Sequence, residues 1–332
     1  MDQLTSPKST SALKFSNLPT DAFGEIMEKC DLKEQLTLRK VSKTLRSLVD
    51  KHKLAYKSIE INPRDSYIFC AYNGKKVVYA SENLDEKEEK GFDKENRIIR
   101  NDDYVKIALN DLSIALKNPK LRLDELHLKV GCRMNQFRLE GLMKQLNHQI
   151  HVKTLRVRAE LPEYFLKNLL SILPCLKPKK LVNIEVFEVI CDNELPSEQA
   201  SKRLRKIANL EQWKQAEQLY AKFSFDYFPF EFLMHFKRFT IFRLYFDKDF
   251  LKNLTDLFST STKFESCTVK AFGLDDCPEF LESFCRKLDT GVPDVLLKEL
   301  LYHYKIPDGS NKMLEFKVDK VQRKMFIEKK NL

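Results

Sequence analysis

Glycine is scarce in this chain, and its scarcity excludes the nucleotide-binding loops that depend on it. The 332 residues include eight glycines, and the two closest, Gly131 and Gly141, are ten positions apart. Neither the dinucleotide motif G-x-G-x-x-G nor the phosphate-binding motif G-x-x-x-x-G-K can therefore be written. The nucleophile motif G-x-S-x-G does not occur either. We expect no catalytic residue and no cofactor, and so a protein that is not an enzyme.

Paired cysteines are also missing. The eight cysteines are spread along the chain without any Cys-x-x-Cys pair. This pattern differs from the dense framework of small secreted domains, so we expect reduced thiols that mostly fill the core. His148 and His151 form an H-x-x-H pair, and Cys277, Cys285 and His303 share a region. Neither group has the regular spacing of a structural zinc site, and we expect no metal.

No stretch is apolar for long enough to cross a bilayer. The most aromatic run, residues 223–246, is interrupted by charged side chains such as Asp226 and Lys237. Residues 1–14 lack the apolar core of a secretory signal and read as a short disordered tail. We expect no membrane association and a cytoplasmic location, with a nuclear one also open.

Basic residues outnumber acidic ones, 58 to 48, which gives a net charge of +10. Such an excess suits a polyanion, because Lys and Arg side chains that neutralise phosphates release counterions. The charge is nevertheless dispersed, with clusters only at residues 177–180 and 202–206, and a charged run on a helix is usually its solvated face. A basic nucleic-acid-binding protein is therefore an alternative hypothesis. The cations that it would use are Lys179, Lys180, Arg203 and Arg205.

The chain does contain a compact set of helix signals near its start. Asp21, Asp31 and Ser42 can each cap a helix, and apolar side chains recur at helical spacing between residues 23 and 49. Three short helices are expected. A unit of about 40 residues buries little apolar surface by itself, so its remaining apolar face needs a cover. That cover is either the rest of this chain or a separate partner.

Residues 15–60 resemble an F-box. Leu18 and Pro19 match the Leu-Pro start of the family, Ile26 matches its first-helix isoleucine, and residues 36–42 match its Leu-x-Leu-Arg-x-Val-Ser core. Leu45 stands where many F-boxes carry tryptophan. The resemblance implies binding to an Skp-type adaptor, which joins F-box proteins to a cullin and a RING ubiquitin ligase. The adaptor-binding residues that it implies are Leu18, Pro19, Ile26, Leu36, Leu38, Val41 and Leu45.

Two short regions follow this unit. Residues 61–81 contain Asn73-Gly74 between β-rich runs, which predicts a small hairpin because both turn residues tolerate positive φ. Residues 82–100 are charged and nearly free of apolar side chains, which is typical of a solvated linker.

An internal repeat predicts the architecture of residues 101–332. The frame apolar-x-x-apolar-x-apolar begins at residues 123, 152, 181, 216, 236, 264 and 313, and helical patterns lie between the frames. Short parallel strands separated by helices resemble a leucine-rich-repeat array, although its regular asparagine ladder is missing. We expect an α/β fold, with an irregular leucine-rich-repeat-like sheet and helices on one side. An ordinary two-layer α/β domain is the alternative.

Three segments of this region are similar to the FTH domain of nematode-type F-box proteins. They are LEQWKQAEQL at 210–219, FPFEFLMHFKRFTIFRL at 228–244 and YKIPDGSNKMLEFKVDKVQRKMFIEKK at 304–330. The resemblance implies that residues 101–332 recruit a protein target, whose identity the sequence does not give. Trp213 is expected as a core anchor, and the aromatic run at 223–246 is expected to pack in the core rather than to stack on bases.

The main hypothesis is therefore a non-catalytic adaptor of a Skp/cullin/F-box ubiquitin ligase, with one surface for the Skp-type adaptor and another for a target. The third hypothesis is a structural interaction protein without a ubiquitin role, in which the F-box-like helices pack only internally.

Overall fold

The computed structural model divides the chain into two compact units. The first unit ends at Ala55, and the second begins at Tyr56. The predicted tail, residues 1–14, lies outside the described residues. The described residues are 18–30, 32–51, 56–92, 96–130, 133–159, 162–188, 198–224, 230–243, 248–271, 277–288 and 297–331.

Three helices form the described part of the first unit: α1 (Thr20–Lys29), α2 (Leu32–Val41) and α3 (Lys43–Lys51). Ser42 caps α3 as predicted, since its Oγ accepts a hydrogen bond from the backbone N–H of Leu45 at 3.1 Å. The prediction of a cap at Asp21 is wrong. The N-cap residue is Pro19, so Asp21 lies inside the first turn, where its charge suits the positive end of the helix dipole. Asp31, the third predicted cap, lies outside the described residues.

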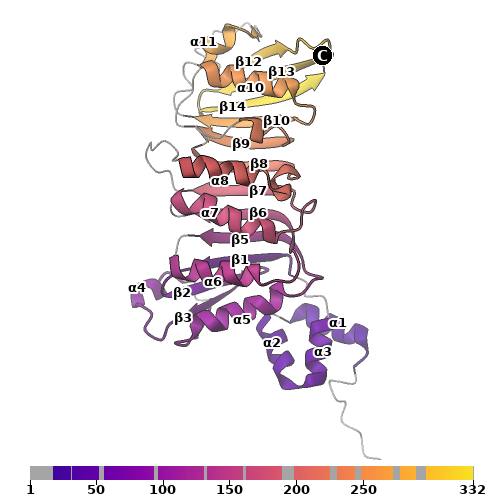
Figure 1. Ribbon diagram of the computed structural model, residues 1–332, viewed down its shortest axis with the longest axis vertical. Helices are drawn as coiled ribbons and strands as arrows, with labels where there is room; N and C mark the ends of the chain where they lie inside the picture. The colour runs from indigo at the N-terminus through magenta and orange to yellow at the C-terminus, as the bar shows by residue number, and fades with distance from the viewer. Residues whose placement is uncertain are drawn as a thin grey trace, which may run out of the picture. The chain divides into compact units, whose positions relative to one another are not determined.

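The second unit has the predicted mixed α/β class and is built on one 14-stranded sheet (Figure 1). The strand order is β11-β12-β13-β14-β10-β9-β8-β7-β6-β5-β1-β2-β3-β4. The strands are β1 (Ser58–Pro63), β2 (Tyr67–Tyr72), β3 (Lys75–Ala80), β4 (Arg97–Arg100), β5 (Arg122–Val130), β6 (His151–Ala159), β7 (Asn183–Glu188), β8 (Gln218–Ser224), β9 (Arg238–Arg243), β10 (Ser266–Ala271), β11 (Arg286–Lys287), β12 (Glu299–Lys305), β13 (Lys312–Asp319) and β14 (Lys324–Asn331).

The central strands β5 to β10 are neighbours in chain order and pair in parallel. The six repeat frames that begin between residues 123 and 264 all lie on or overlap these strands. The second and third apolar positions of each frame are two residues apart, so they point to the same face of the sheet. In β6 these positions are Leu155 and Val157, and both are fully buried. Their burial explains why the frame predicts strand positions.

Helices cover this apolar face. Figure 1 shows α5, α6, α7, α8 and α10 along one side of the sheet. Among the described helices, none is long and apolar enough to span a membrane. The helices of the unit are α4 (Glu86–Glu89), α5 (Tyr104–Leu116), α6 (Arg133–Lys144), α7 (Pro162–Ile172), α8 (Glu198–Ala208), α9 (Glu211–Lys214), α10 (Lys248–Thr260) and α11 (Cys277–Glu282), with 3-10 turns at Leu173–Cys175 and Phe230–Phe232. That this strand-and-helix array is related to leucine-rich repeats stays a prediction.

The C-terminal strands depart from the predicted parallel array. The frame at residue 313 lies on β13 as a strand, but β13 pairs antiparallel with both β12 and β14, and β14 pairs antiparallel with β10. The frame specifies which side chains face inward and carries no information on strand direction. The turn before β13, with Gly309 at φ +76°, reverses the chain without a crossover helix.

The predicted boundaries at the start of the sheet also need correction. The Asn73-Gly74 turn is present, with φ values of 50° and 80°. The hairpin predicted at 61–81 is not a separate element, because it forms strands β1 to β3 of the large sheet. The F-box predicted at 15–60 runs past the unit boundary, since β1 begins at Ser58, and the domain predicted from residue 101 begins at Tyr56. Parallel pairing of β1 with β5 joins these segments, and that pairing has no local sequence signal.

The prediction of a solvated linker at 82–100 is also wrong, because this segment is part of the folded unit. It contains α4 and β4, and its apolar residues Leu84, Phe92 and Ile98 pack with Val78 and Ala80 on the face of β3 away from α5. The ring of Phe92 meets that of Tyr67 edge to face at 5.0 Å. The three apolar side chains of this charged segment therefore pack against apolar residues of β2 and β3.

Candidate functional site

The helical unit has a small core of its own. Phe23 and Met27 of α1 pack with Leu45 and Val49 of α3, and all four side chains are buried. The partly buried Leu48 packs against the same cluster. Four side chains form a small core, and a small core leaves the unit with limited stability of its own. Any partner that covers further apolar surface of these helices would stabilise it.

Gln35 joins two of these helices, which the sequence analysis missed. The side chain is 6% exposed, and its Nε2 donates hydrogen bonds to the carbonyl oxygens of Met27 and Cys30, each at 3.0 Å. These carbonyls belong to the last turn of α1 and its C-cap, where helical partners run out. No sequence signal pointed to this contact, because Gln35 stands in a largely polar stretch beside Lys33 and Glu34. The contact fixes the start of α2 against the end of α1.

Four of the predicted adaptor-binding residues lie outside this core. Val41, the last residue of α2, is 66% exposed. Pro19 is exposed, and Leu18 and Ile26 are half-buried. Val41 is therefore an apolar side chain that the described part of its own helical unit leaves exposed.

The other predicted adaptor-binding residues are placed differently. Leu45 is 7% exposed and belongs to the core of the unit, and Leu38 is partly buried against that core. In these positions both side chains support the packing of the helices, and their contact with an adaptor stays a prediction. Leu36 lies on α2, but its side chain is outside the part of the chain described at that level.

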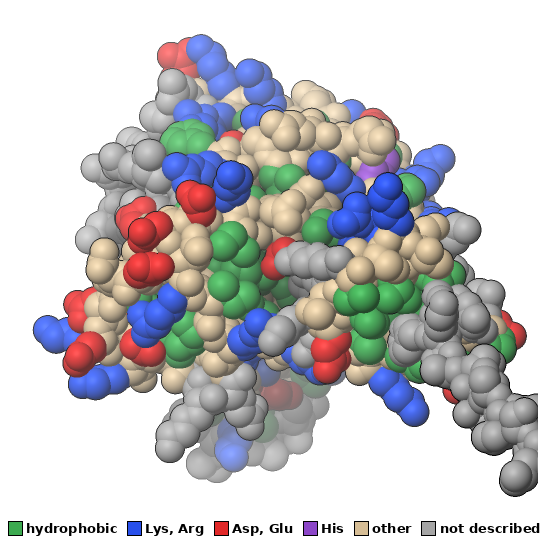
Figure 2. All heavy atoms as spheres, turned by 90° about the horizontal axis from the view of Figure 1, so that it is seen from below, with side chains coloured by type: hydrophobic (Ala, Val, Ile, Leu, Met, Phe, Trp, Pro, Cys, Tyr) green, Lys and Arg blue, Asp and Glu red, His purple; other side chains and the backbone are tan. Residues whose placement is uncertain are grey.

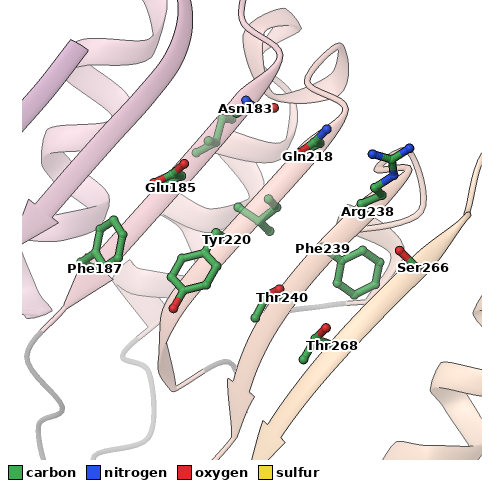
Figure 3. Close-up of a pocket in the computed structure, with 12 residues that line it drawn as sticks. Asn183, Glu185, Phe187, Gln218, Tyr220, Arg238, Phe239, Thr240, Ser266 and Thr268 are labelled. Carbon is green, nitrogen blue, oxygen red and sulfur yellow. The ribbon is translucent and has the colours of Figure 1, made fainter. Parts of the chain in front are cut away.

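A second surface lies on the sheet, on the face away from the helices. Across β7 to β10 it forms a hollow of about 480 Å³. Figure 3 shows the side chains that line it, among them Asn183, Glu185, Gln218 and Thr240, standing on neighbouring strands. Along each of these strands the polar side chains alternate with buried apolar ones, such as Val186, that face the helices. The period of two therefore separates a packed face from an open polar one.

Charge on this open face is partly neutralised by a ladder across three strands. The Nε of Arg156 on β6 donates to Glu185 on β7 at 2.7 Å, and a terminal nitrogen of Arg156 donates to Glu125 on β5 at 3.1 Å. His127, also on β5, lies 3.6 Å from Glu60 on the neighbouring strand β1. Burial lowers the pKa of His127 even though the Glu60 carboxylate acts to raise it. The three carboxylates of this row therefore outnumber the guanidinium of Arg156, and these groups together carry net negative charge.

Trp213 is in the core, as predicted. Its ring is 2% exposed, and its Nε1–H donates to the carbonyl oxygen of Phe232 at 3.1 Å. The aromatic run at 223–246 is divided between the two faces: Phe236 and Phe239 are buried, whereas Phe242 is half-buried on the open face. The prediction of core packing is therefore right for the first two and wrong for Phe242.

The histidines and cysteines do not form a metal site among the residues that the structure describes, where no group of three or more His, Cys, Asp or Glu could hold an ion. Burial raises the pKa of Cys277 to about 12, and its sulfur lies 3.8 Å from that of Met325. Burial likewise raises the pKa of Cys285 to about 12. Both thiols are therefore protonated at neutral pH and poorly nucleophilic.

The two basic clusters are solvated surfaces. In α8 the residues Leu204 and Ile207 are buried while Arg205 is exposed, and Lys202 pairs with Glu198 at 2.7 Å. Lys179 is exposed in the turn before β7, with φ at 65°. Figure 2 shows one side of the molecule, on which Lys and Arg side chains are interspersed with Asp and Glu. The broad single-sign patch typical of a duplex-binding surface is not visible there.

Two protein-family models match the chain. The model described as F-box domain matches residues 15–57, and the model described as FTH domain matches residues 137–287. The first match covers the helical unit and stops at the start of β1. The second runs from α6 to β11 and includes the hollow on the sheet. No curated protein matches the chain.

Proposed function

The chain is an F-box protein with an FTH domain, and from this we propose that it is the substrate-recognition subunit of a Skp/cullin/F-box ubiquitin ligase. F-box proteins are in general non-catalytic adaptors. In this proposal the helical unit binds an Skp-type adaptor, and through it a cullin, while the FTH-bearing unit binds a protein target. A cytoplasmic location is part of the same proposal.

The F-box match over residues 15–57 carries the proposal, and the exposure of Val41 on the matched helices supports it. Full burial of a valine side chain contributes about 1.5–3 kcal/mol, so covering a side chain that is 66% exposed is worth about 1–2 kcal/mol. A micromolar complex needs about 8 kcal/mol, which one side chain does not supply. The half-buried Leu18 and Ile26 and the exposed Pro19 have to contribute as well.

Binding of this kind follows the helix-in-groove pattern, in which apolar side chains of short helices enter a preformed groove of the partner. The core of Phe23, Met27, Leu45 and Val49 holds the helices in position before the partner arrives. This reduces the entropy that binding would otherwise lose. The exposed cations Lys43 and Arg46 lie at solvent-facing positions of α3, where they affect the association rate more than the affinity.

The ligase role of the chain is then positional. A target held by the second unit and a ubiquitin-loaded enzyme held through the adaptor share one assembly, so their encounter becomes intramolecular. Effective concentrations in such assemblies reach the order of millimolar. Ubiquitin transfer takes place on the partners, and no side chain of this chain has to act as an acid, base or nucleophile.

Co-purification of the full chain with a recombinant Skp-type adaptor tests the proposal. Wild type is compared with Val41→Asp and with the double variant Leu18→Ala and Pro19→Ala. Ser47→Asp is the matched control, because Ser47 is exposed on α3 while its neighbours Leu45 and Val49 are buried on the opposite side. We expect wild type and Ser47→Asp to retain the adaptor and the other two variants to lose most of it.

Equal recovery of the adaptor by Val41→Asp and wild type would refute the assignment of this surface. Failure of wild type itself to bind would refute the adaptor proposal as a whole. Far-ultraviolet circular dichroism of each variant separates lost binding from lost folding, and an unchanged helix signal is expected for Val41→Asp because that side chain packs against little of its own unit.

A further inference from the structure

Three aromatic side chains stand on the open face of the sheet, where polar residues would be expected. They are Phe187 on β7, Tyr220 on β8 and Phe242 on β9, and each is half-buried. The ring centroids of Phe187 and Tyr220 are 5.4 Å apart, and those of Tyr220 and Phe242 are 6.3 Å apart. Figure 3 shows the first two rings side by side at one end of the hollow. We call these three residues the aromatic platform.

Packing inside the protein does not account for the platform. The residue before each ring on its strand faces the helices and is buried, and these residues are Val186, Leu219 and Ile241. Ala221, which follows Tyr220, is buried too. The platform residues therefore point to the other side, together with polar neighbours such as Thr240 and Thr268. Burial raises the pKa of the Tyr220 hydroxyl, with a smaller contribution from the Glu185 carboxylate, so the ring carries no charge at neutral pH. A continuous apolar strip on a polar sheet face is a feature of binding surfaces.

Cations flank the platform on both sides. The register pairs Arg158 on β6 with Phe187, pairs Phe187 with Lys222 on β8, and pairs Phe242 with Lys270 on β10. The Nζ of Lys270 lies 5.1 Å from the centroid of the Phe242 ring. Register partners on parallel strands share a face, so the three cations and the rings form one surface.

These three cations differ from two other basic residues on the same face. Arg156, two residues before Arg158 on β6, is held by Glu125 and Glu185. Lys129, the register partner of Arg158 on β5, lies 3.6 Å from Glu60. Within the described ranges, by contrast, neither Arg158, Lys222 nor Lys270 has a carboxylate in salt-bridge distance. The positive charge of these three side chains is thus available to a ligand, while that of Arg156 and Lys129 is already paired with carboxylates.

We propose that the aromatic platform and its flanking cations bind an acidic peptide segment that carries one aromatic or aliphatic anchor residue. The inference rests on the proposed function, because it names the chemistry of the protein target. The hollow of about 480 Å³, which Phe187 and Tyr220 help to line, accepts the anchor. The cations lie level with Phe187 and Phe242 and meet carboxylates of the segment on that side of the hollow. The anchor supplies apolar contact, and the acidic flanks set orientation and association rate.

The ring geometry favours a peptide over a single-stranded nucleic acid. Base stacking needs ring faces that are open and roughly parallel. Here Phe187 and Tyr220 are inclined by 40°, Tyr220 and Phe242 by 75°, and the ammonium group of Lys270 lies over the face of Phe242. Such a mixture of ring edges and faces suits an apolar side chain.

A peptide array tests the inference on the full chain. Its nonapeptides place Trp, Leu, Ser or Lys at the centre, and their flanking residues are all Asp and Glu, all Gln, or all Lys. Wild type is expected to bind the peptides with acidic flanks and a Trp or Leu centre. The triple variant Arg158→Gln, Lys222→Gln and Lys270→Gln should bind these peptides about tenfold more weakly, since three exposed charge pairs are lost. One molar salt should have a similar effect.

Two further variants complete the test. The control triple variant Lys202→Gln, Arg205→Gln and Lys252→Gln makes the same change in charge at exposed residues of α8 and α10 and should bind like wild type. The double variant Phe187→Ser and Phe242→Ser should lose the preference for a Trp or Leu centre while it keeps the preference for acidic flanks.

Three outcomes would overturn the inference. They are equal binding by the two triple variants, no preference for acidic flanks in wild type, and binding of an oligo(U) RNA that competes with every peptide. Binding of the Skp-type adaptor is measured on the same preparations. Lost peptide preference with retained adaptor binding refutes this inference alone, whereas lost adaptor binding in wild type refutes the proposed function.

Discussion

Replacing Trp213 by phenylalanine should destabilise the sheet unit by an amount that the structure allows us to work out. The change removes the indole N–H that donates to the Phe232 carbonyl at 3.1 Å, which costs about 1–2 kcal/mol when a buried acceptor loses a donor. It also removes half of a ring system that is 2% exposed and meets Phe236 edge to face at 5.3 Å, which adds about 1–2 kcal/mol for lost contact and residual cavity. The expected loss is about 2–4 kcal/mol.

Thermal unfolding followed by circular dichroism measures this loss. For a unit of this size about 1 kcal/mol corresponds to about 2 °C, so the midpoint should fall by roughly 4–8 °C. Trp213 is the only tryptophan in the chain, and its fluorescence in wild type reports this site alone. Its emission should be blue-shifted in the native state and move to the red at the same midpoint.

The matched control is Val321→Ala, at a side chain that is 73% exposed and should change stability by less than about 0.5 kcal/mol. A midpoint of Trp213→Phe within error of wild type would refute the reasoning, as would native emission typical of a solvent-exposed indole. Either result would mean that the indole, which belongs to α9, is not held against the 3-10 turn at Phe230–Phe232.

Further predictions concern a buried acid, a turn and the helical unit. Burial alone would raise the pKa of Glu315, but hydrogen bonds from Lys330 and His303 outweigh it and lower the pKa. Its ionised form therefore stabilises the fold above the unfolded pKa of about 4.3, and this contribution is lost as the pH falls through the lower folded pKa. Glu315→Gln should lower the free energy of unfolding by about 1–3 kcal/mol at pH 7, as measured by urea titration. Below about pH 5 the free energy of unfolding should fall less steeply in the variant than in wild type. The same pH dependence in both proteins would contradict the ion-pair account. Gly74→Ala should cost about 1–2 kcal/mol in thermal unfolding, because φ is +80° there although a Cβ would meet nothing within 4 Å. Gly141→Ala within α6 has equally open space and should be neutral or stabilising. Equal effects of the two substitutions would refute the role of φ. Leu45→Asp should abolish protection from hydrogen exchange in α1 to α3 and leave the Trp213 emission unchanged, because the two units are separate; a change in that emission would contradict this division.

Much of the sheet could be predicted because burial in a strand has a period of two. The frames at 152 and 181 place Leu155, Val157, Ile184 and Val186 inward, and all four are buried. The same period explains the failure at Phe242, which follows Ile241 and so points to the other face. The prediction of core packing treated residues 223–246 as a whole, although side chains along β9 alternate between the two faces of the sheet.

The failures involve pairing between distant segments. Nothing local in residues 58–63 indicates that they pair with β5, more than 60 residues later, so the hairpin and the charged segment after it looked separate. Strand direction at β13 was equally invisible, because the inward pattern is the same for parallel and antiparallel neighbours.

The adaptor-binding site stays a prediction. The sequence pattern and the family resemblance pointed to α1 and α2, and the exposure of Val41 agrees with an apolar surface there. The same pattern could not separate Leu45, which holds the unit together, from side chains that face outward, because both kinds are apolar. All the adaptor contacts stay predictions, namely those of Leu18, Pro19, Ile26, Leu36, Leu38, Val41 and Leu45. Gln35 was missed because amide hydrogen bonds to helix ends depend on the approach of two helices.

Hydrogen exchange of the full chain with and without a saturating Skp-type adaptor tests the central claim most directly. If the apolar surface around Val41 meets that partner, exchange should slow in peptides covering α1 to α3 and stay unchanged in β5 to β10. Unchanged exchange in α1 to α3, or protection confined to the sheet, would contradict the claim that these helices are a docking unit for another protein.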